Sequence, residues 1–167
     1  MPGYKTHISG AIYMWSIALM VIVLVQALSN TGFFTWYHGL EWLLAALVGG
    51  QFPDVDIKSK AQQRLYAVVI FMGVIMFGVS YIFNYSYYTL AVMLLISLLP
   101  LVFNHKRIMH SWLVITGLVV VVYGVTYYYY PFLVAFMWYD LLFFWLGAMS
   151  HLWLDGKGIL ARGRVRS

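Results

Sequence analysis

The segment Asn104-His105-Lys106-Arg107-Ile108-Met109-His110-Ser111 is a polar island between two long apolar runs of the chain. Two histidines and two cations within eight residues are costly to place in hydrophobic surroundings. Three shorter polar islands share this character: Thr6-His7, Pro53-Asp54-Val55-Asp56, and the stretch from His151 to Asp155. We predict that the four islands meet at one surface of a membrane.

The composition predicts an all-α integral membrane protein. Of the 167 residues, 63% are hydrophobic and only 9% are charged, and the mean hydropathy is +0.84. Soluble domains carry about 25% charged residues, so this chain lacks the polar surface that a water-soluble protein needs. Cysteine is absent, which excludes disulfides, thiolate metal sites and cysteine nucleophiles. The length suits a single transmembrane domain over residues 1–167.

Six apolar runs are each long enough to cross a membrane as a helix. They cover approximately residues 8–28, 34–52, 65–83, 86–103, 112–130 and 132–150. A signal peptide is the alternative for the first run, because Lys5 precedes it and Val25-Gln26-Ala27 resembles a cleavage site; we expect the run to be retained as a helix. The second run could be re-entrant, but we expect it to span. Gly156 and Gly158 are expected to end the last helix.

The positions of the basic residues support about six transmembrane helices with both termini in the cytoplasm. All the lysines and arginines fall at the N-terminus, after the second and fourth runs, or at the C-terminus. They are Lys5, Lys58, Lys60, Arg64, Lys106, Arg107, Lys157, Arg162, Arg164 and Arg166. Cytoplasmic loops of membrane proteins carry an excess of lysine and arginine. This asymmetry therefore places the four polar islands at the cytoplasmic side.

The islands contain histidines and aspartates at spacings that suit a metal ion. His151 and Asp155 are four residues apart and share one helix face. Asp54 and Asp56 are two apart, so their carboxylates point the same way if the segment is extended. Imidazole and carboxylate are the ligands that zinc takes where thiolate is absent. The predicted ligands are His7, Asp54, Asp56, His105, His110, His151 and Asp155.

Structural roles remain open for several of these residues. His7 could be an interfacial side chain, and the two aspartates after Pro53 could form a turn. Ser111 could be a helix cap. Arg107, with Lys106, could determine topology alone or could also bind a phosphate or carboxylate.

Glu41 and Asp140 lie within apolar runs. They are either hydrogen-bond partners between helices or part of a proton path, and we leave them outside the site. A metal or proton transporter is a weaker hypothesis for the protein, because its polar residues gather at one surface and not at the middle of the membrane.

The set of motifs resembles the YdjM-like family of bacterial inner-membrane proteins, which are regarded as metal-dependent hydrolases. That family shows Thr-His near the N-terminus, Pro-Asp-x-Asp, a segment of the type His-Arg-Gly-x-Thr-His-Ser, and a late Gly-x-x-x-His-x-x-x-Asp. These stand here as Thr6-His7, Pro53 to Asp56, His105 to Ser111, and Gly147 to Asp155. The chain departs from the pattern at Ile57, Lys106 and Met109, where histidine, arginine and threonine are usual, and it lacks the glycine.

The resemblance implies hydrolase activity at the inner (cytoplasmic) membrane. We expect a membrane-embedded metal-dependent hydrolase that acts at the cytoplasmic interface on a phospholipid or another phosphoester. The expected cofactor is a divalent metal, zinc before others, with Asp54 as a ligand or general base and Arg107 as an anion clamp. The alternative is a non-catalytic membrane assembly or scaffold subunit with a structural polar or metal cluster. We expect contact with membrane lipids, allow for a membrane or cytoplasmic protein partner, and expect no nucleic-acid binding.

The topology can be tested by labelling because the chain has no native cysteine. A single cysteine introduced by Ser59→Cys should react with a membrane-impermeant maleimide from the cytoplasmic side, and one introduced by Asn84→Cys should react from the opposite side. Labelling of both from the same side would contradict the predicted number of crossings.

Overall fold

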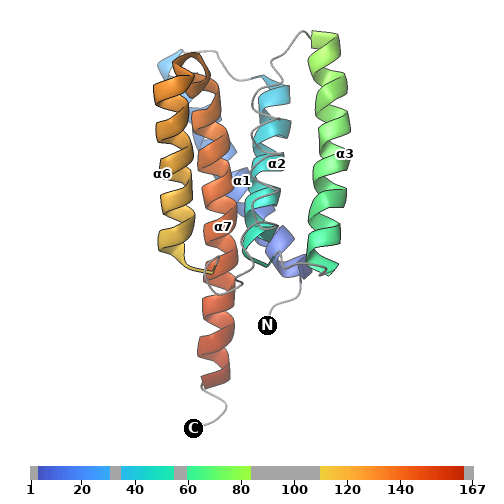
Figure 1. The fold of residues 1–167 in the computed structure, drawn as a ribbon, viewed down its shortest axis with the longest axis vertical. Coiled ribbons are helices and arrows are strands. Elements are labelled where there is room, and N and C mark those ends of the chain that lie inside the picture. Colours follow the sequence, from blue (N-terminus) through green and yellow to red (C-terminus); the bar gives the residue numbers. More distant parts are fainter. Residues whose placement is uncertain (1–3, 31–34, 55–59, 84–109, 164–167) are drawn as a thin grey trace.

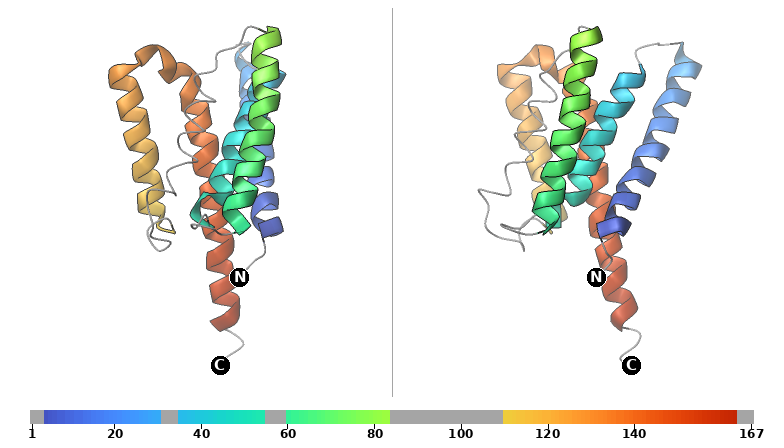
Figure 2. Two further views of the ribbon diagram at one scale, coloured as in Figure 1. Left: turned by 45° about the vertical axis from the view of Figure 1, so that its right-hand side comes forward. Right: turned by 90° about the vertical axis from the view of Figure 1, so that its right-hand side faces the viewer.

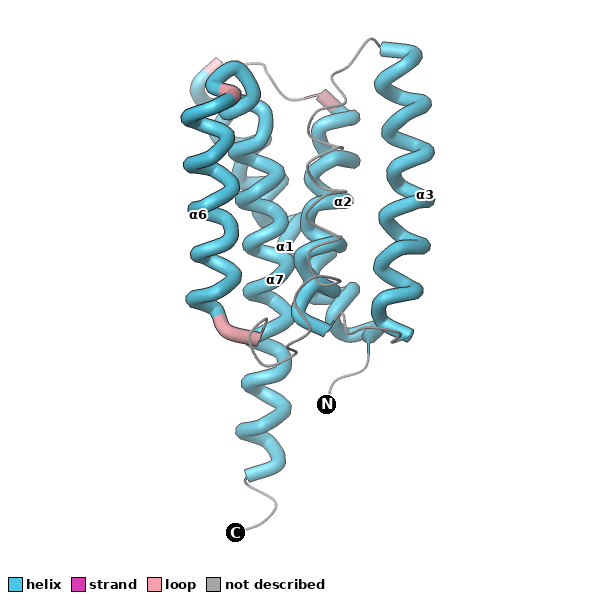
Figure 3. Tube along the Cα trace, viewed as in Figure 1, coloured by secondary structure: helices cyan, strands magenta, loops and turns pink. Residues whose placement is uncertain are grey.

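The computed structural model describes residues 4–30, 35–54, 60–83 and 110–163, and every regular element in these ranges is helical (Figure 3). The predicted all-α class is therefore confirmed. The apolar run at residues 86–103 lies outside the described residues. The elements are α1 (Tyr4–Ser29), α2 (Trp36–Gln51), η1 (Phe52–Asp54), α3 (Lys60–Phe83), α6 (Trp112–Tyr129), η2 (Pro131–Leu133) and α7 (Val134–Gly163).

The helices run along one common direction and form a bundle with both chain ends on the same side (Figure 1). Helices α1, α3 and α6 begin at this end of the bundle, and α2 and α7 return to it (Figures 1 and 2). Pro131 breaks the chain between α6 and α7, as predicted, because η2 turns it through a short 3-10 helix. The last part of α7 extends beyond the other helices (Figure 1).

Helices α2 and α7 approach each other more closely than side chains would permit. A Cβ atom added at Gly49 would overlap the carbonyl group of Phe144, and one added at Gly147 would overlap the carbonyl group of Ala46. Small residues at such crossings let two backbones come into contact, which is a common way of packing helices in membranes. The core on both sides of the crossing is apolar and includes Trp42 and Phe143, which are buried.

Helices α1 and α6 pack on this central pair. At the end that carries the chain termini, the Cβ of Ala11 on α1 lies only 2.7 Å from where a Cβ of Gly50 would stand. Toward the other end of α1, the indole of Trp15 donates a hydrogen bond to the Gly39 carbonyl at 3.1 Å. On the α6 side, the indole of Trp145 on α7 donates to the Thr116 hydroxyl at 3.0 Å. These contacts hold α1 against α2 and α6 against α7.

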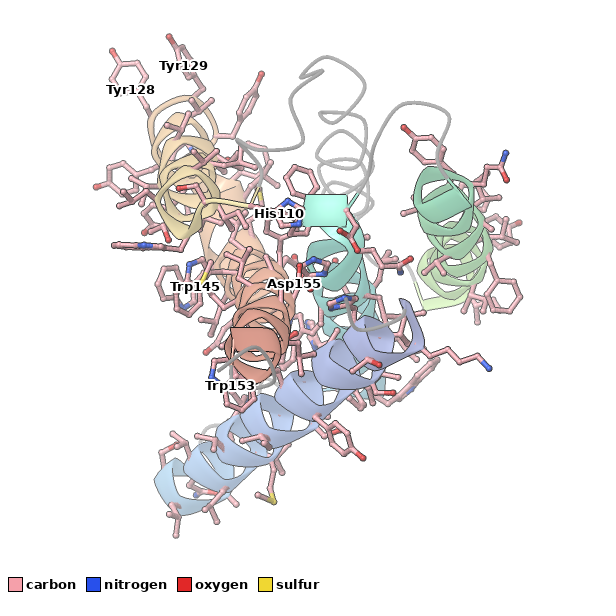
Figure 4. The ribbon with its side chains drawn as sticks, turned by 90° about the horizontal axis from the view of Figure 1, so that it is seen from below. His110, Tyr128, Tyr129, Trp145, Trp153 and Asp155 are labelled. Carbon is pink, nitrogen blue, oxygen red and sulfur yellow. The ribbon has the colours of Figure 1, made fainter. Side chains whose placement is uncertain are left out.

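Two of the described helices are long and apolar enough to cross a membrane by length and composition, over Lys5–Ser29 and Trp112–Tyr129. Only 6% and 11% of their most apolar windows are buried inside the bundle. Their apolar side chains are therefore mostly exposed, as lipid-facing helices require. The tyrosines from Tyr127 to Tyr130 are also exposed, and Tyr128 and Tyr129 point away from the bundle (Figure 4).

Two local predictions were wrong. Helix α7 does not end at Gly156 and Gly158 but continues to Gly163. A glycine inside a helix costs only about 1 kcal/mol, which the good helix formers that follow can offset. Asp54 is not in an extended segment, because Phe52–Asp54 continue the chain direction of α2 as a 3-10 helix. Pro53 is tolerated there because a first-turn position needs no backbone N–H.

The α2–α7 crossing predicts a strong dependence on glycine. We expect Gly147→Ala to lower the stability of the purified protein by about 1–3 kcal/mol, because the added methyl group forces the two backbones apart. The matched control is Gly124→Ala on α6, where a Cβ would meet nothing within 4 Å. Thermal unfolding in detergent should show a lower midpoint for the first variant and an equal or slightly higher midpoint for the second, because alanine favours the helix more than glycine does. Equal midpoints would contradict the close crossing.

Candidate metal centre

Four side chains from three parts of the chain meet at the end of the bundle that carries both termini. Asp54 follows α2, His110 precedes α6, and His151 and Asp155 lie one turn apart on α7. Each offers one nitrogen or oxygen atom, and these four atoms all lie within 4.8 Å of one another. Figure 4, seen from this end, shows His110 and Asp155 close together beside α7.

His151 is oriented by the backbone of α2. Its Nδ1 atom lies 2.9 Å from the Gly50 carbonyl oxygen, and since a carbonyl only accepts hydrogen bonds, Nδ1 must carry the proton. Gly50 lies in the last turn of α2, where carbonyl groups lack the usual partner four residues on. In the neutral ring, Nε2 then presents its lone pair. The ring is fully buried, and Nε2 makes no hydrogen bond.

The distances among the four atoms fit one shared ion better than hydrogen bonds. His110 Nε2 lies 3.4 Å from Asp54 Oδ1 and 3.5 Å from Asp155 Oδ2. His151 Nε2 lies 3.6 Å and 3.3 Å from the same two oxygens. Charge-assisted hydrogen bonds are shorter, about 2.7–2.9 Å. A tetrahedron of ligands about 2.1 Å from a central ion has edges of about 3.4 Å, and four of the six edges here match that value.

His7 lies beside this group and contacts it through Asp155. Its Nε2 is 3.6 Å from Asp155 Oδ1, whereas Oδ2 of the same carboxylate faces His110 and His151. The His7 ring also stacks on the His151 ring, with centroids 3.9 Å apart and an interplanar angle of 23°. Both rings are buried. His7 is therefore placed to orient Asp155 and His151.

The electrostatics of the group favour an ionised Asp54. Without a metal ion, hydrogen bonding from the imidazoles of His110 and His151, in the form that carries a proton on Nε2, holds the pKa of the Asp54 carboxyl far below its usual range, and this effect exceeds the opposing effect of burial. The site is also open on one side: the side chains of Asp54 and His110 are 38% and 28% exposed, whereas that of His151 is 0% exposed. A ligand can therefore approach from the side of Asp54 and His110.

The structure places the other predicted residues as follows. Asp56, His105 and Arg107 lie outside the described residues. Ser111 occupies the N-cap position of α6 but its side chain makes no capping hydrogen bond. His38 lies at the start of α2, at the opposite end of the bundle, where its Nδ1 accepts a hydrogen bond from the Thr35 amide at 3.2 Å.

One functional group was missed by sequence reasoning, the carbonyl of Gly50. No role was predicted from the sequence for the adjacent glycines 49 and 50, which lie near the end of the second apolar run. Their position before Pro53, together with Gly147 one turn before His151, was the signal for a close helix contact at the site.

The fold and the site thus define a helical bundle with a His/Asp group that could hold a metal ion at one end. The YdjM inner membrane protein family model matches residues 1–157, and the chain belongs to this family. No curated protein and no solved structure matches the chain significantly. The family and the two apolar helices together indicate a membrane location.

The depressed pKa of Asp54 predicts how acid affects stability without metal. The folded state holds this carboxyl ionised more strongly than the unfolded state does, so the contribution is present above the unfolded pKa of about 3.9 and is lost as the pH falls below it. With a chelator present, the unfolding midpoint of the wild type should fall more steeply between about pH 5 and pH 3 than that of Asp54→Asn. Parallel curves for the two proteins would contradict this role of Asp54.

Proposed function

We propose that the protein is a membrane-embedded metal-dependent hydrolase whose site is the His/Asp group at the cytoplasmic interface. The observation that carries the proposal is the set of four separations of 3.3–3.6 Å between imidazole nitrogens and carboxylate oxygens. Without an ion, these atoms are too far apart for strong hydrogen bonds and too buried for full hydration. A cation at their centre satisfies all four.

Zinc is the ion that the donor set favours. Two imidazoles and two carboxylates without thiolate are typical of zinc and related divalent ions, and edges of about 3.4 Å suit a four-coordinate ion better than the roughly 3.0 Å of an octahedral one. The hydrogen bond from His151 to the Gly50 carbonyl supports ligation, because metal-binding histidines usually donate their other N–H to such a group. With Asp54 acting as a general base, His110, His151 and Asp155 would leave a fourth position open, where a bound divalent cation would supply an activated water and polarise the scissile ester.

The bundle supports six crossings with cytoplasmic termini. Both chain ends lie at one end of the bundle, together with the His/Asp group (Figure 1). The starts of α1 and α3, which carry Lys5, Lys60 and Arg64, are at that same end. Six crossings place one further crossing between α3 and α6 in the chain, so α3 must end and α6 must begin at opposite ends of the bundle. The two helices do so (Figure 1). On this topology the site faces the inner leaflet.

The proposed substrate is a phosphoester with an apolar tail, such as a phospholipid. The exposed side of the site, at Asp54 and His110, is where its head group would enter. Asp54 is placed to act as a ligand or as a general base, because its carboxyl is held ionised and accessible. Arg107 remains the proposed anion clamp on the grounds of its position three residues before His110. Asp56 and His105 remain proposed as further ligands, as does His7.

Metal content tests the proposal first. Wild-type protein purified without chelator should retain about one or more zinc ions per chain, measured by elemental analysis. His151→Ala and Asp155→Ala should lose nearly all of it, because each removes one of four donors at a site that needs them all. The control is His38→Ala, which removes a histidine at the far end of the bundle. Zinc retained in all three variants would contradict the site.

Catalysis is tested separately on anionic liposomes. The wild type loaded with zinc should release phosphate or fatty acid, His38→Ala should do the same, and His151→Ala and Asp155→Ala should not. Retained zinc without hydrolysis would favour the alternative, a non-catalytic membrane assembly or scaffold subunit with a protein partner. In that case the same variants should alter the protein's association with other membrane or cytoplasmic proteins.

A further inference from the structure

A second pair of acidic side chains lies inside the bundle, away from the His/Asp group. Glu41 on α2 is 3% exposed and Asp140 on α7 is 0% exposed. The two helices are in contact at this level, because the Trp42 ring stacks on the rings of Tyr139 and Phe143 at centroid distances of 4.9 and 5.1 Å. Glu41 precedes Trp42 and Asp140 follows Tyr139, so the contact between these two rings places the two acids at the same level of the α2–α7 contact.

Among the described residues, Asp140 has no polar partner that would stabilise a negative charge, and neither of its carboxyl oxygens makes a hydrogen bond to them. Its neighbours along α7 include the buried side chains of Met137, Leu141 and Phe144. An isolated carboxylate in such surroundings is strongly disfavoured, so a buried acid takes up a proton or a counter-ion instead. A second carboxylate nearby adds repulsion to this cost.

Basic residues are too distant to serve as counter-ions in the described part of the chain. Lys5, Lys60 and Arg64 begin helices at the end of the bundle that carries the termini, and Lys157 follows Asp155. Asp140 precedes His151 by eleven residues, which is roughly 16 Å along a helix. The acid pair therefore lies deep in the bundle, about three turns from the His/Asp group.

The other titratable groups at this level do not bond to Asp140. His38 is on α2 one turn before Glu41, Tyr139 is adjacent on α7, and Tyr123 on α6 contacts Trp138. On α1, the nearest polar contact is the Trp15 indole, which donates to the Gly39 carbonyl. Among the described residues, Glu41 is thus the charged group that faces Asp140.

We propose that Glu41 and Asp140 form an acid pair that binds one proton between α2 and α7, as a site distinct from the metal centre. One carboxylate takes up a proton from water and becomes a carboxylic acid, and the other can then accept a hydrogen bond from it. Two acids that share one proton in this way avoid the repulsion of two buried negative charges. The pair thereby holds a titratable proton inside the apolar part of the bundle.

Infrared spectroscopy of the full-length protein in detergent tests the pair directly. At neutral pH the wild type should show the carbonyl band of a protonated carboxylic acid, and Asp140→Asn should lose at least nine-tenths of it or shift it markedly, as should Glu41→Gln. Asp155→Asn and addition of a chelator should leave the band unchanged, which separates this site from the metal centre. Because the Asn and Gln variants keep side-chain size, their unfolding midpoints show whether they fold.

A second measurement uses the apolar reagent dicyclohexylcarbodiimide, which reacts with protonated carboxyl groups in apolar surroundings. Mass spectrometry should find the adduct on Asp140 or Glu41 and not on Asp54, whose carboxyl is ionised. The proposal is overturned if folded wild-type protein shows no protonated-acid band at neutral pH that depends on either residue. It is also overturned if sodium or calcium at constant pH abolishes the band, since the pair would then bind a metal cation.

Discussion

The close contact between α2 and α7 is the constraint on which the rest of the structure depends. Gly49 and Gly147 allow the two backbones to touch, and any side chain at these positions would collide with a carbonyl group of the opposite helix. Dispersion forces at such short range favour association of helices where lipid removes the hydrophobic driving force between them. Because the contact lies in the last turn of α2, it also brings the Gly50 carbonyl within reach of His151.

The position of the His/Asp group follows from this contact. His151 lies one turn after Gly147, so its ring reaches the level of the bundle at which α2 ends. Asp54 follows α2 immediately and lies at the same level. Helix α1 contributes His7, whose ring stacks on the His151 ring. Asp54, His110 and His7 thus come from three different helix ends, and His151 and Asp155 both come from α7. The arrangement is rigid on the α7 side and open toward Asp54 and His110.

Much of this could be predicted from particular residues. The apolar runs gave α2 and α6 within about two residues, Pro131 gave the start of α7, and the spacing of His151 and Asp155 gave their shared face. The grouping of Asp54 and His110 with them was also predicted. It rested on the location of the basic residues, which sorts polar islands to one side of a membrane but does not position their atoms.

The parts that could not be predicted depend on contacts between helices. Periodicity along one helix does not indicate which neighbour it contacts, so the roles of Gly49, Gly50 and Gly147 in helix packing were not predicted. The 3-10 conformation at Asp54 depends on packing around Pro53, and the continuation of α7 beyond Gly156 on tertiary context.

Helix α7 carries Asp140, Phe144, Gly147 and His151 along one stripe, since eleven residues make almost three whole turns. A helix rotates and slides as one body. A displacement of α7 that withdrew Asp140 from Glu41 would therefore also pull His151 off the Gly50 carbonyl. A rigid-body movement of α7 would therefore affect the interior acids and the His/Asp group together, whereas a local substitution that leaves α7 in place affects only one of them.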